Sequence, residues 1–264
     1  MTLRAYLRLL NIFYKNTLMS ELEYRTSFTA NVLTSLFWLV WAALSVRVFF
    51  FQTETIAGWT YNELLVVVGL FFTMNGLRQL FLQPNLSRLS EYVQMGTLDY
   101  ILTKPINSQF LVSLRYIGVE NCGDPLLGLA LLGLALWRMG YTPGVIDVLL
   151  FLTLVASALV ILYSFNLMIQ TTTFWLINIR RADSLVWSLL EAGRFPVQFY
   201  TGWVRLALTV IVPVAFMTTF PAQALLGRLP AWIAAVALLM AGVLFLLASA
   251  FWRVGLRSYS GASS

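Results

Sequence analysis

The chain has 264 residues, of which 59% are hydrophobic, 15% aromatic and only 11% charged. Soluble domains carry about 25% charged residues, so this chain has too few to cover a globule of its size with a water-soluble surface. A mean hydropathy of +0.80 agrees. These values exclude a soluble enzyme and predict an all-α polytopic membrane protein. The sequence contains no histidine and a single cysteine, Cys122, which removes imidazole chemistry, internal disulfides and thiolate metal clusters.

The first predicted element is a basic amphipathic helix within residues 1–26. From Leu3 to Tyr14, apolar residues recur at helical spacing, with Arg4, Arg8 and Lys15 on the opposite stripe. Such a helix lies in the headgroup region of a membrane and does not cross it. We therefore expect it to rest at the cytoplasmic interface.

Six apolar segments follow, each long enough for a span of about 20 residues. They cover residues 27–51, 62–82, 110–137, 145–170, 202–220 and 231–252. Polar residues and Pro125 interrupt the third segment, so we predict one kinked span that begins in the cytoplasmic interface. Residues 253–264 are expected to form a cytoplasmic tail, and residues 1–264 to form a single transmembrane domain.

The distribution of basic residues predicts that both termini are cytoplasmic. Cytoplasmic segments of membrane proteins are enriched in Lys and Arg. With the N-terminus inside, 13 of the 17 basic residues fall on the cytoplasmic side: Arg4, Arg8, Lys15, Arg25, Arg78, Arg88, Lys104, Arg115, Arg180, Arg181, Arg194, Arg253 and Arg257. This asymmetry also accounts for the net charge of +6 without nucleic acid as a partner.

Two cytoplasmic loops are predicted to contain short helices. In the first, Ser87 can cap a helix that Gly96 ends, and Thr97 can cap a second turn that ends at Pro105. In the second, residues 182–192 form another short helix. Such helices either rest in the interface or serve as contacts for a cytoplasmic partner, and periodicity does not choose between these readings.

The run from Gly96 to Pro105 reads GTLDYILTKP and is followed by Ile106, Asn107 and Phe110. It resembles the G-T-L-D-x-x-L-x-[KR]-P motif in the corresponding loop of a bacterial group of ABC-2 type transporter permeases. The six spans, the length, Pro213 and Pro221 are similar to that group as well. The resemblance implies a type-2 ABC exporter-like fold in the bacterial inner membrane. It also implies a second permease chain, identical or sister, and two cytoplasmic ATPase subunits.

The resemblance directs attention to two sets of residues. The first set forms the expected ATPase-coupling loop: Arg88, Glu91, Gly96, Leu98, Asp99, Ile101, Leu102, Lys104 and Pro105. In this interpretation Leu98, Ile101 and Leu102 are the apolar anchors. The second set, Glu120, Asn121 and Asp124, lies deep in the third span and is a candidate substrate path, because buried polar groups in membranes usually face protein or water.

The chain itself is not expected to hydrolyse ATP. Its only lysines, Lys15 and Lys104, lie outside any G-x-x-x-x-G-K-[ST] sequence. ATP and magnesium are therefore expected in a partner subunit, with no cofactor or metal bound by this chain. The alternatives are a membrane-embedded lipid-modifying enzyme, which usually needs clustered carboxylates or histidine, and an ATP-independent carrier. The sequence does not indicate the cargo.

Overall fold

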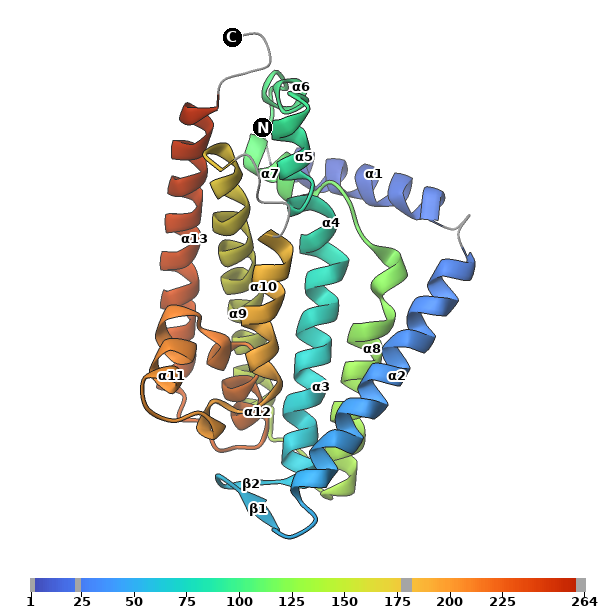
Figure 1. Cartoon of the computed structure of the whole chain (residues 1–264), viewed down its shortest axis with the longest axis vertical. Coiled ribbons are helices and arrows are strands. Elements are labelled where there is room, and N and C mark those ends of the chain that lie inside the picture. The colour runs from blue at the N-terminus through green and yellow to red at the C-terminus, as the bar shows by residue number, and fades with distance from the viewer. Residues whose placement is uncertain (1–2, 22–24, 177–181, 260–264) are drawn as a thin grey trace.

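The computed structural model describes residues 3–21, 25–176 and 182–259, and these residues are almost entirely helical (Figure 1). Helix α1 (Leu3–Glu21) lies across one end of a helical bundle, and α2 (Arg25–Phe49) runs to the opposite end. There β1 (Thr55–Ile56) and β2 (Trp59–Thr60) form an antiparallel hairpin. We call this the hairpin end, and the end beside α1 the loop end.

Helix α3 (Tyr61–Leu77) belongs to a rod of 34 residues that reaches from Tyr61 to Gln94. It continues through a π-helical turn (Arg78–Leu82), α4 (Gln83–Leu86) and α5 (Leu89–Gln94). The second span therefore does not stop at residue 82 as expected. Ser87 does not cap a new helix either, because its hydroxyl donates to the Gln83 carbonyl at 2.5 Å. Gly96 ends the rod with φ of +67°, as its position predicted.

The third span begins later than residue 110, where it was expected to start. Helix α6 (Asp99–Leu102) and α7 (Ser108–Leu114) stay at the loop end, and the span begins with a 3-10 turn (Val119–Asn121) and α8 (Gly123–Arg138). Asn85 fixes the break, because its side chain both accepts from the Tyr116 amide and donates to the Tyr116 carbonyl at 2.7 Å. These bonds hold the residues between α7 and the 3-10 turn against the side of the α3 rod.

Helices α9 (Val145–Thr171), extended by a 3-10 turn (Thr172–Phe174), and α13 (Trp232–Ser258) lie side by side (Figure 1). The alanines Ala237 and Ala241 are buried in a cluster with Leu154 and Phe216, and Ala234 of the same helix is buried as well. Small residues of this kind allow close packing between membrane helices. The structure uses them inside one chain.

Helix α10 (Ala182–Glu191) corrects the predicted topology. The sequence placed residues 182–192 in a cytoplasmic loop, but α10 lies inside the bundle beside α9 and α3 (Figure 1). Trp187 meets Phe71 of α3 with ring centroids 6.0 Å apart. Farther along, Phe195 meets Phe49, the last residue of α2, at 6.3 Å. The segment from α10 to Phe195 therefore lies within the bundle and ends at the hairpin end.

The predicted fifth span, residues 202–220, is bent instead of straight. Its parts are α11 (Gly202–Leu206), a π-helical turn (Ala207–Ile211), a 3-10 turn (Val214–Phe216) and α12 (Thr219–Leu225). The two halves meet at 67°. Pro213 explains the bend, since proline lacks the amide hydrogen that continues a helix and restricts the residue before it. Both halves lie in the hairpin half of the bundle (Figure 1).

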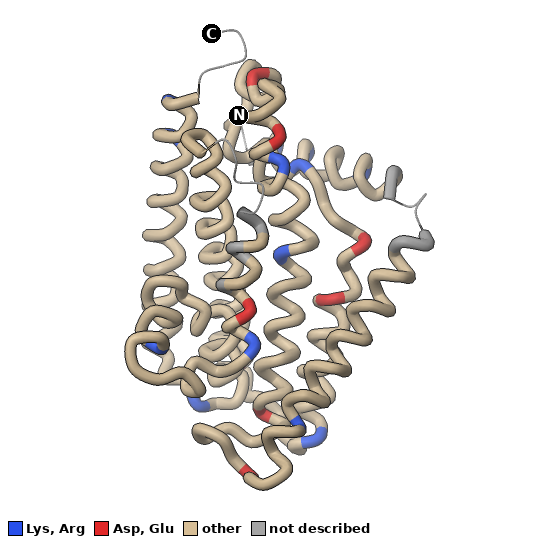
Figure 2. Tube along the Cα trace, viewed as in Figure 1, with Lys and Arg blue, Asp and Glu red and all other residues tan. Residues whose placement is uncertain are grey.

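Five helices are long and apolar enough to cross a membrane, and the bent pair would make a sixth by composition. The described residues run the length of the bundle in α2, α3, α8, α9 and α13, with α10 among them, and both α1 and the last turn of α13 lie at the loop end (Figure 1). Figure 2 shows basic residues within the bundle as well as at its ends. Arg78 and Arg194 belong to the interior group, whereas Arg180 and Arg181 lie outside the described residues.

Candidate functional site

A cavity of about 660 Å³, here called the polar cavity, lies between α2, α3, α8 and α10. Most of its lining consists of amides, hydroxyls and charged groups, although it sits at the level of the apolar spans. The lining residues are Asn31, Thr34, Ser35, Trp38, Phe71, Phe72, Asn75, Arg78, Gln79, Gln83, Asn121, Asp124, Ser184, Trp187, Glu191 and Arg194. Polar groups inside a membrane domain are costly unless protein or water faces them, so this concentration makes the cavity the candidate functional site.

Arg78 and Asp124 are the most deeply placed charges of the cavity. Arg78 is 4% exposed, donates through Nε and Nη2 to Asn75 Oδ1 at 3.3 Å, and lies 5.7 Å over the Trp187 ring. Asp124, 9% exposed, accepts from the Gln79 amide at 2.9 Å. The π-helical turn begins at Arg78, and such irregular turns are frequent at functional sites.

The predicted substrate-path residues fall near this cavity. Asn121 and Asp124 line it, whereas Glu120 does not. Glu120 Oε1 accepts from the Asn121 amide at 3.1 Å, and its Oε2 is buried without a hydrogen-bond partner among the described residues. Sequence reasoning missed Arg78 and Gln79 as parts of this site, although their position at the end of an apolar span was a visible signal. It also missed Trp187, because α10 had been assigned to a loop.

The coupling-loop residues divide into buried and exposed groups. Leu98 is 0% and Ile101 5% exposed, because both pack into the chain's own core with Leu86 and Leu89. The expectation that they form an exposed apolar face is therefore wrong. Gly96 supplies the turn at the end of the rod, and Pro105 is exposed beyond α6.

Two charged residues of the loop also have internal contacts. Arg88 lies 4.0 Å over the Tyr116 ring. This contact joins the rod to the residues that precede α8. Burial, together with the Asp99 carboxylate, raises the pKa of Tyr259, the residue that follows α13.

The exposed surface of the loop is different from the predicted one. Tyr100 is 73%, Met95 66% and Leu102 39% exposed, and Glu91 and Lys104 are exposed around them. We call these five residues the loop-tip surface. Met95 and Tyr100 were missed, since helical spacing alone does not tell which side of a short helix the rest of the protein covers.

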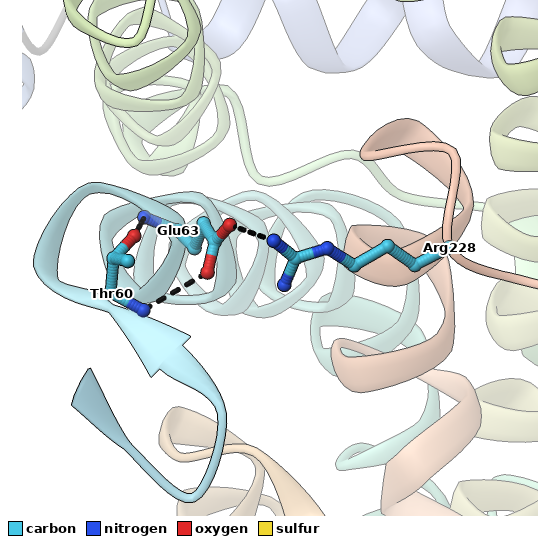
Figure 3. A network of polar contacts seen from close by, with 3 residues as sticks. All are labelled: Thr60, Glu63 and Arg228. Carbon is cyan, nitrogen blue, oxygen red and sulfur yellow. Dashed lines mark hydrogen bonds and ion pairs between the residues drawn. The ribbon is translucent and has the colours of Figure 1, made fainter.

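At the hairpin end, one buried carboxylate joins two distant segments (Figure 3). Glu63, 6% exposed, accepts from the Thr60 amide at 2.9 Å as part of the α3 cap and forms an ion pair with Arg228. Arg228 follows α12, so this pair fastens the bent segment to the start of α3.

Comparison with known protein families shows to which family the chain belongs. The family model for ABC-2 family transporter proteins matches residues 36–263. The chain belongs to this family. The permease therefore contributes the membrane part of a transport system. The loop-tip surface lies within the matched range, as does the lining of the polar cavity apart from Asn31, Thr34 and Ser35. No curated protein and no solved structure matches the chain.

Proposed function

We propose that the permease forms half of the translocation pathway of an ATP-driven exporter and that separate ATPase subunits bind its loop end. The observation that carries this proposal is the α3 rod. This continuous helical element carries Asn75, Arg78 and Gln79, which line the polar cavity. It also carries Glu91, which belongs to the loop-tip surface. A force applied at the tip can therefore reach the cavity without passing through a flexible linker.

The mechanism we propose is alternating access. ATP-dependent closure of two ATPase subunits, which carry ATP and Mg²⁺, displaces the loop tip and tilts the rod. The π-helical turn at Arg78–Leu82 offers a place for the rod to change its winding beside the cavity. Nucleotide biases this equilibrium only if the tip contacts differ between the two states.

A second permease chain, identical or sister, completes the pathway in this proposal. The polar cavity is bounded by one chain's α2, α3, α8 and α10. Lipid against the exposed lining residues Thr34 and Glu191 would place their polar groups in hydrocarbon at a cost. A facing subunit supplies cover and encloses a path. The basic residues of the loop end favour its placement on the cytoplasmic side of the bacterial inner membrane.

Paired substitutions at the loop test the proposed ATPase contact. Tyr100→Ala removes an exposed ring, so the permease should fold normally but bind its ATPase at least about tenfold more weakly, as exposed aromatic anchors often dominate interfaces. Leu98→Ala should instead lower thermal stability, since truncating a buried leucine costs about 2–5 kcal/mol. Co-purification with the natural ATPase and thermal unfolding measure the two effects.

Trp137→Ala is the matched control for Tyr100→Ala. Trp137 is 77% exposed and lies near the C-terminal end of α8, at the hairpin end and far from the loop tip. Met95→Asp places a charge on the same exposed surface. If Tyr100→Ala and Met95→Asp both bind the ATPase as tightly as the wild type does, the loop tip is not the docking surface. Transport by the purified permease without any ATPase would favour an ATP-independent carrier.

A further inference from the structure

A second hollow, of about 640 Å³, opens on a different part of the molecule, between α1, α7, α9 and α13. We call it the α1 groove. Its walls are mainly apolar and include Leu7, Leu10, Phe110, Val160 and Phe245. Helix α1 covers it from the loop end, with Tyr6 against Phe110 at a ring-centroid distance of 4.7 Å. The volume lies within the range of about 300–1,000 Å³ typical of ligand pockets.

One side of the α1 groove carries a connected set of polar groups. The Gln109 amide donates to the Tyr163 hydroxyl and to the Ser249 hydroxyl, each at 3.0 Å. The Ser113 and Tyr163 hydroxyls are 2.9 Å apart, and Ser113 is 1% exposed. The network therefore places hydroxyl and amide groups on one wall of an otherwise apolar groove.

The order of groups along α13 indicates the kind of occupant. Phe245, Ser249 and Arg253 follow one another at four-residue spacing, which places them on one helix face. Arg253 bends back toward Ser249, since its Nε donates to the Ser249 carbonyl at 3.2 Å. Toward the loop end, this face therefore changes from aromatic ring to hydroxyl to guanidinium. Arg4 and Arg8 of α1 are exposed on either side of the groove residue Leu7.

This gradient matches an amphiphile with an apolar chain and an anionic head. We infer that the α1 groove holds one anionic phospholipid of the leaflet in which α1 lies. An acyl chain lies against Val160 and Phe245, and the phosphate lies at Arg253. Basic groups at the membrane surface attract anionic headgroups, and an amphipathic helix such as α1 lies at that depth.

The inferred lipid is not the cargo of the polar cavity. The polar cavity is lined from α2, α3, α8 and α10, and the α1 groove from α1, α7, α9 and α13 apart from one residue, Leu82, of the α3 rod. The inference needs only a chain embedded in a membrane, so it does not depend on the proposed ATPase. A lipid in this position would fasten α1 to the bundle.

The test uses the full-length permease in nanodiscs of phosphatidylcholine alone or mixed with phosphatidylglycerol. Native mass spectrometry after detergent extraction counts the retained lipids, and thermal unfolding reports the stabilisation. The wild-type permease should retain one phosphatidylglycerol per chain and be stabilised by it. Arg253→Gln should weaken retention about fivefold, the effect expected of one basic group near anionic lipid, and Val160→Trp should abolish retention by filling the groove.

Arg138→Gln is the matched control, because Arg138 is an exposed arginine at the hairpin end. It should retain phosphatidylglycerol as the wild type does. Equal retention of phosphatidylcholine and phosphatidylglycerol by the wild type would overturn the inference, as would unaltered retention by both Arg253→Gln and Val160→Trp. A photo-cross-linker at Val160 that captures a second permease chain instead of lipid would overturn it too.

Discussion

At the residue scale, the Glu63–Arg228 pair shows how one side chain serves two elements. Glu63 closes the first turn of α3 by accepting from the Thr60 amide, and its other oxygen binds Arg228 beyond α12 (Figure 3). The carboxylate is buried, whereas the Arg228 side chain is half exposed. The two partners are 165 positions apart in sequence, so the pair stabilises tertiary structure and not only a helix end.

Arg228→Ala should therefore destabilise the permease by about 1–3 kcal/mol, because it leaves a buried carboxylate without its cation. The same substitution in the Glu63→Gln background should cost less, since no buried charge is then uncovered. Thermal unfolding of the four proteins gives the coupling energy between the two positions. Equal costs of Arg228→Ala in both backgrounds would mean that the ion pair contributes nothing.

At the element scale, glycines permit the close contact of α3 with α8. A Cβ atom built on Gly69 would lie 2.7 Å from the Gly128 carbonyl oxygen, and one on Gly128 would lie 2.6 Å from the Gly69 carbonyl oxygen. Small residues let the backbones of membrane helices approach closely. This contact sets the position of α8, which carries Asp124 into the polar cavity.

We expect Gly128→Ala to destabilise the permease by about 1–3 kcal/mol, because the added methyl group meets backbone atoms that cannot move away independently. Gly133 lies five residues later on the same helix, and a Cβ atom there would meet no atom within 4 Å. Gly133→Ala should be neutral or stabilise by up to about 1 kcal/mol, the difference in helix propensity. Thermal unfolding compares the two, and a lower stability of Gly133→Ala than of Gly128→Ala would contradict this account.

The position of α10 gives a second prediction for an element. With Cys122 replaced by alanine, Phe49→Cys and Phe195→Cys should cross-link readily, because the two rings lie 6.3 Å apart at the hairpin end. The topology expected from sequence would place them on opposite sides of the membrane. Phe49→Cys with Arg88→Cys is the control and should not cross-link. Failure of the Phe49→Cys and Phe195→Cys pair to cross-link would restore the sequence-based topology.

At the scale of the whole molecule, the polar cavity bears on the assembly. Thr34 of α2 lines this cavity, whereas Leu239 is 70% exposed on α13 and is not among the lining residues. If a second permease chain covers the cavity, a photo-activated cross-linker at Thr34 should yield a product with the mass of two permeases. The same reagent at Leu239 should not. Recovery of a transporting complex with one permease chain would exclude this arrangement.

The sequence by itself determined the membrane class, the helical content, most of the spans and the permease family. Each depends on information that accumulates along a continuous stretch of chain. A window of about 20 apolar residues predicts a span whatever it packs against, and the GTLDYILTKP run is a contiguous pattern. The stop at Gly96 also follows from a local backbone requirement, which its φ of +67° confirms.

Only the tertiary structure decided which short segments enter the bundle and which side chains remain exposed. Helix α10 has ten residues and carries Asp183, Ser184, Ser188 and Glu191, so it does not have the composition of a span. It enters the bundle because its neighbours offer partners such as Phe71 and Arg78 to Trp187. Leu98 and Leu102 are both leucines in the same short segment, yet Leu98 is buried and Leu102 is exposed, for the same reason. Burial depends on contacts between residues far apart in the chain, which local periodicity does not contain.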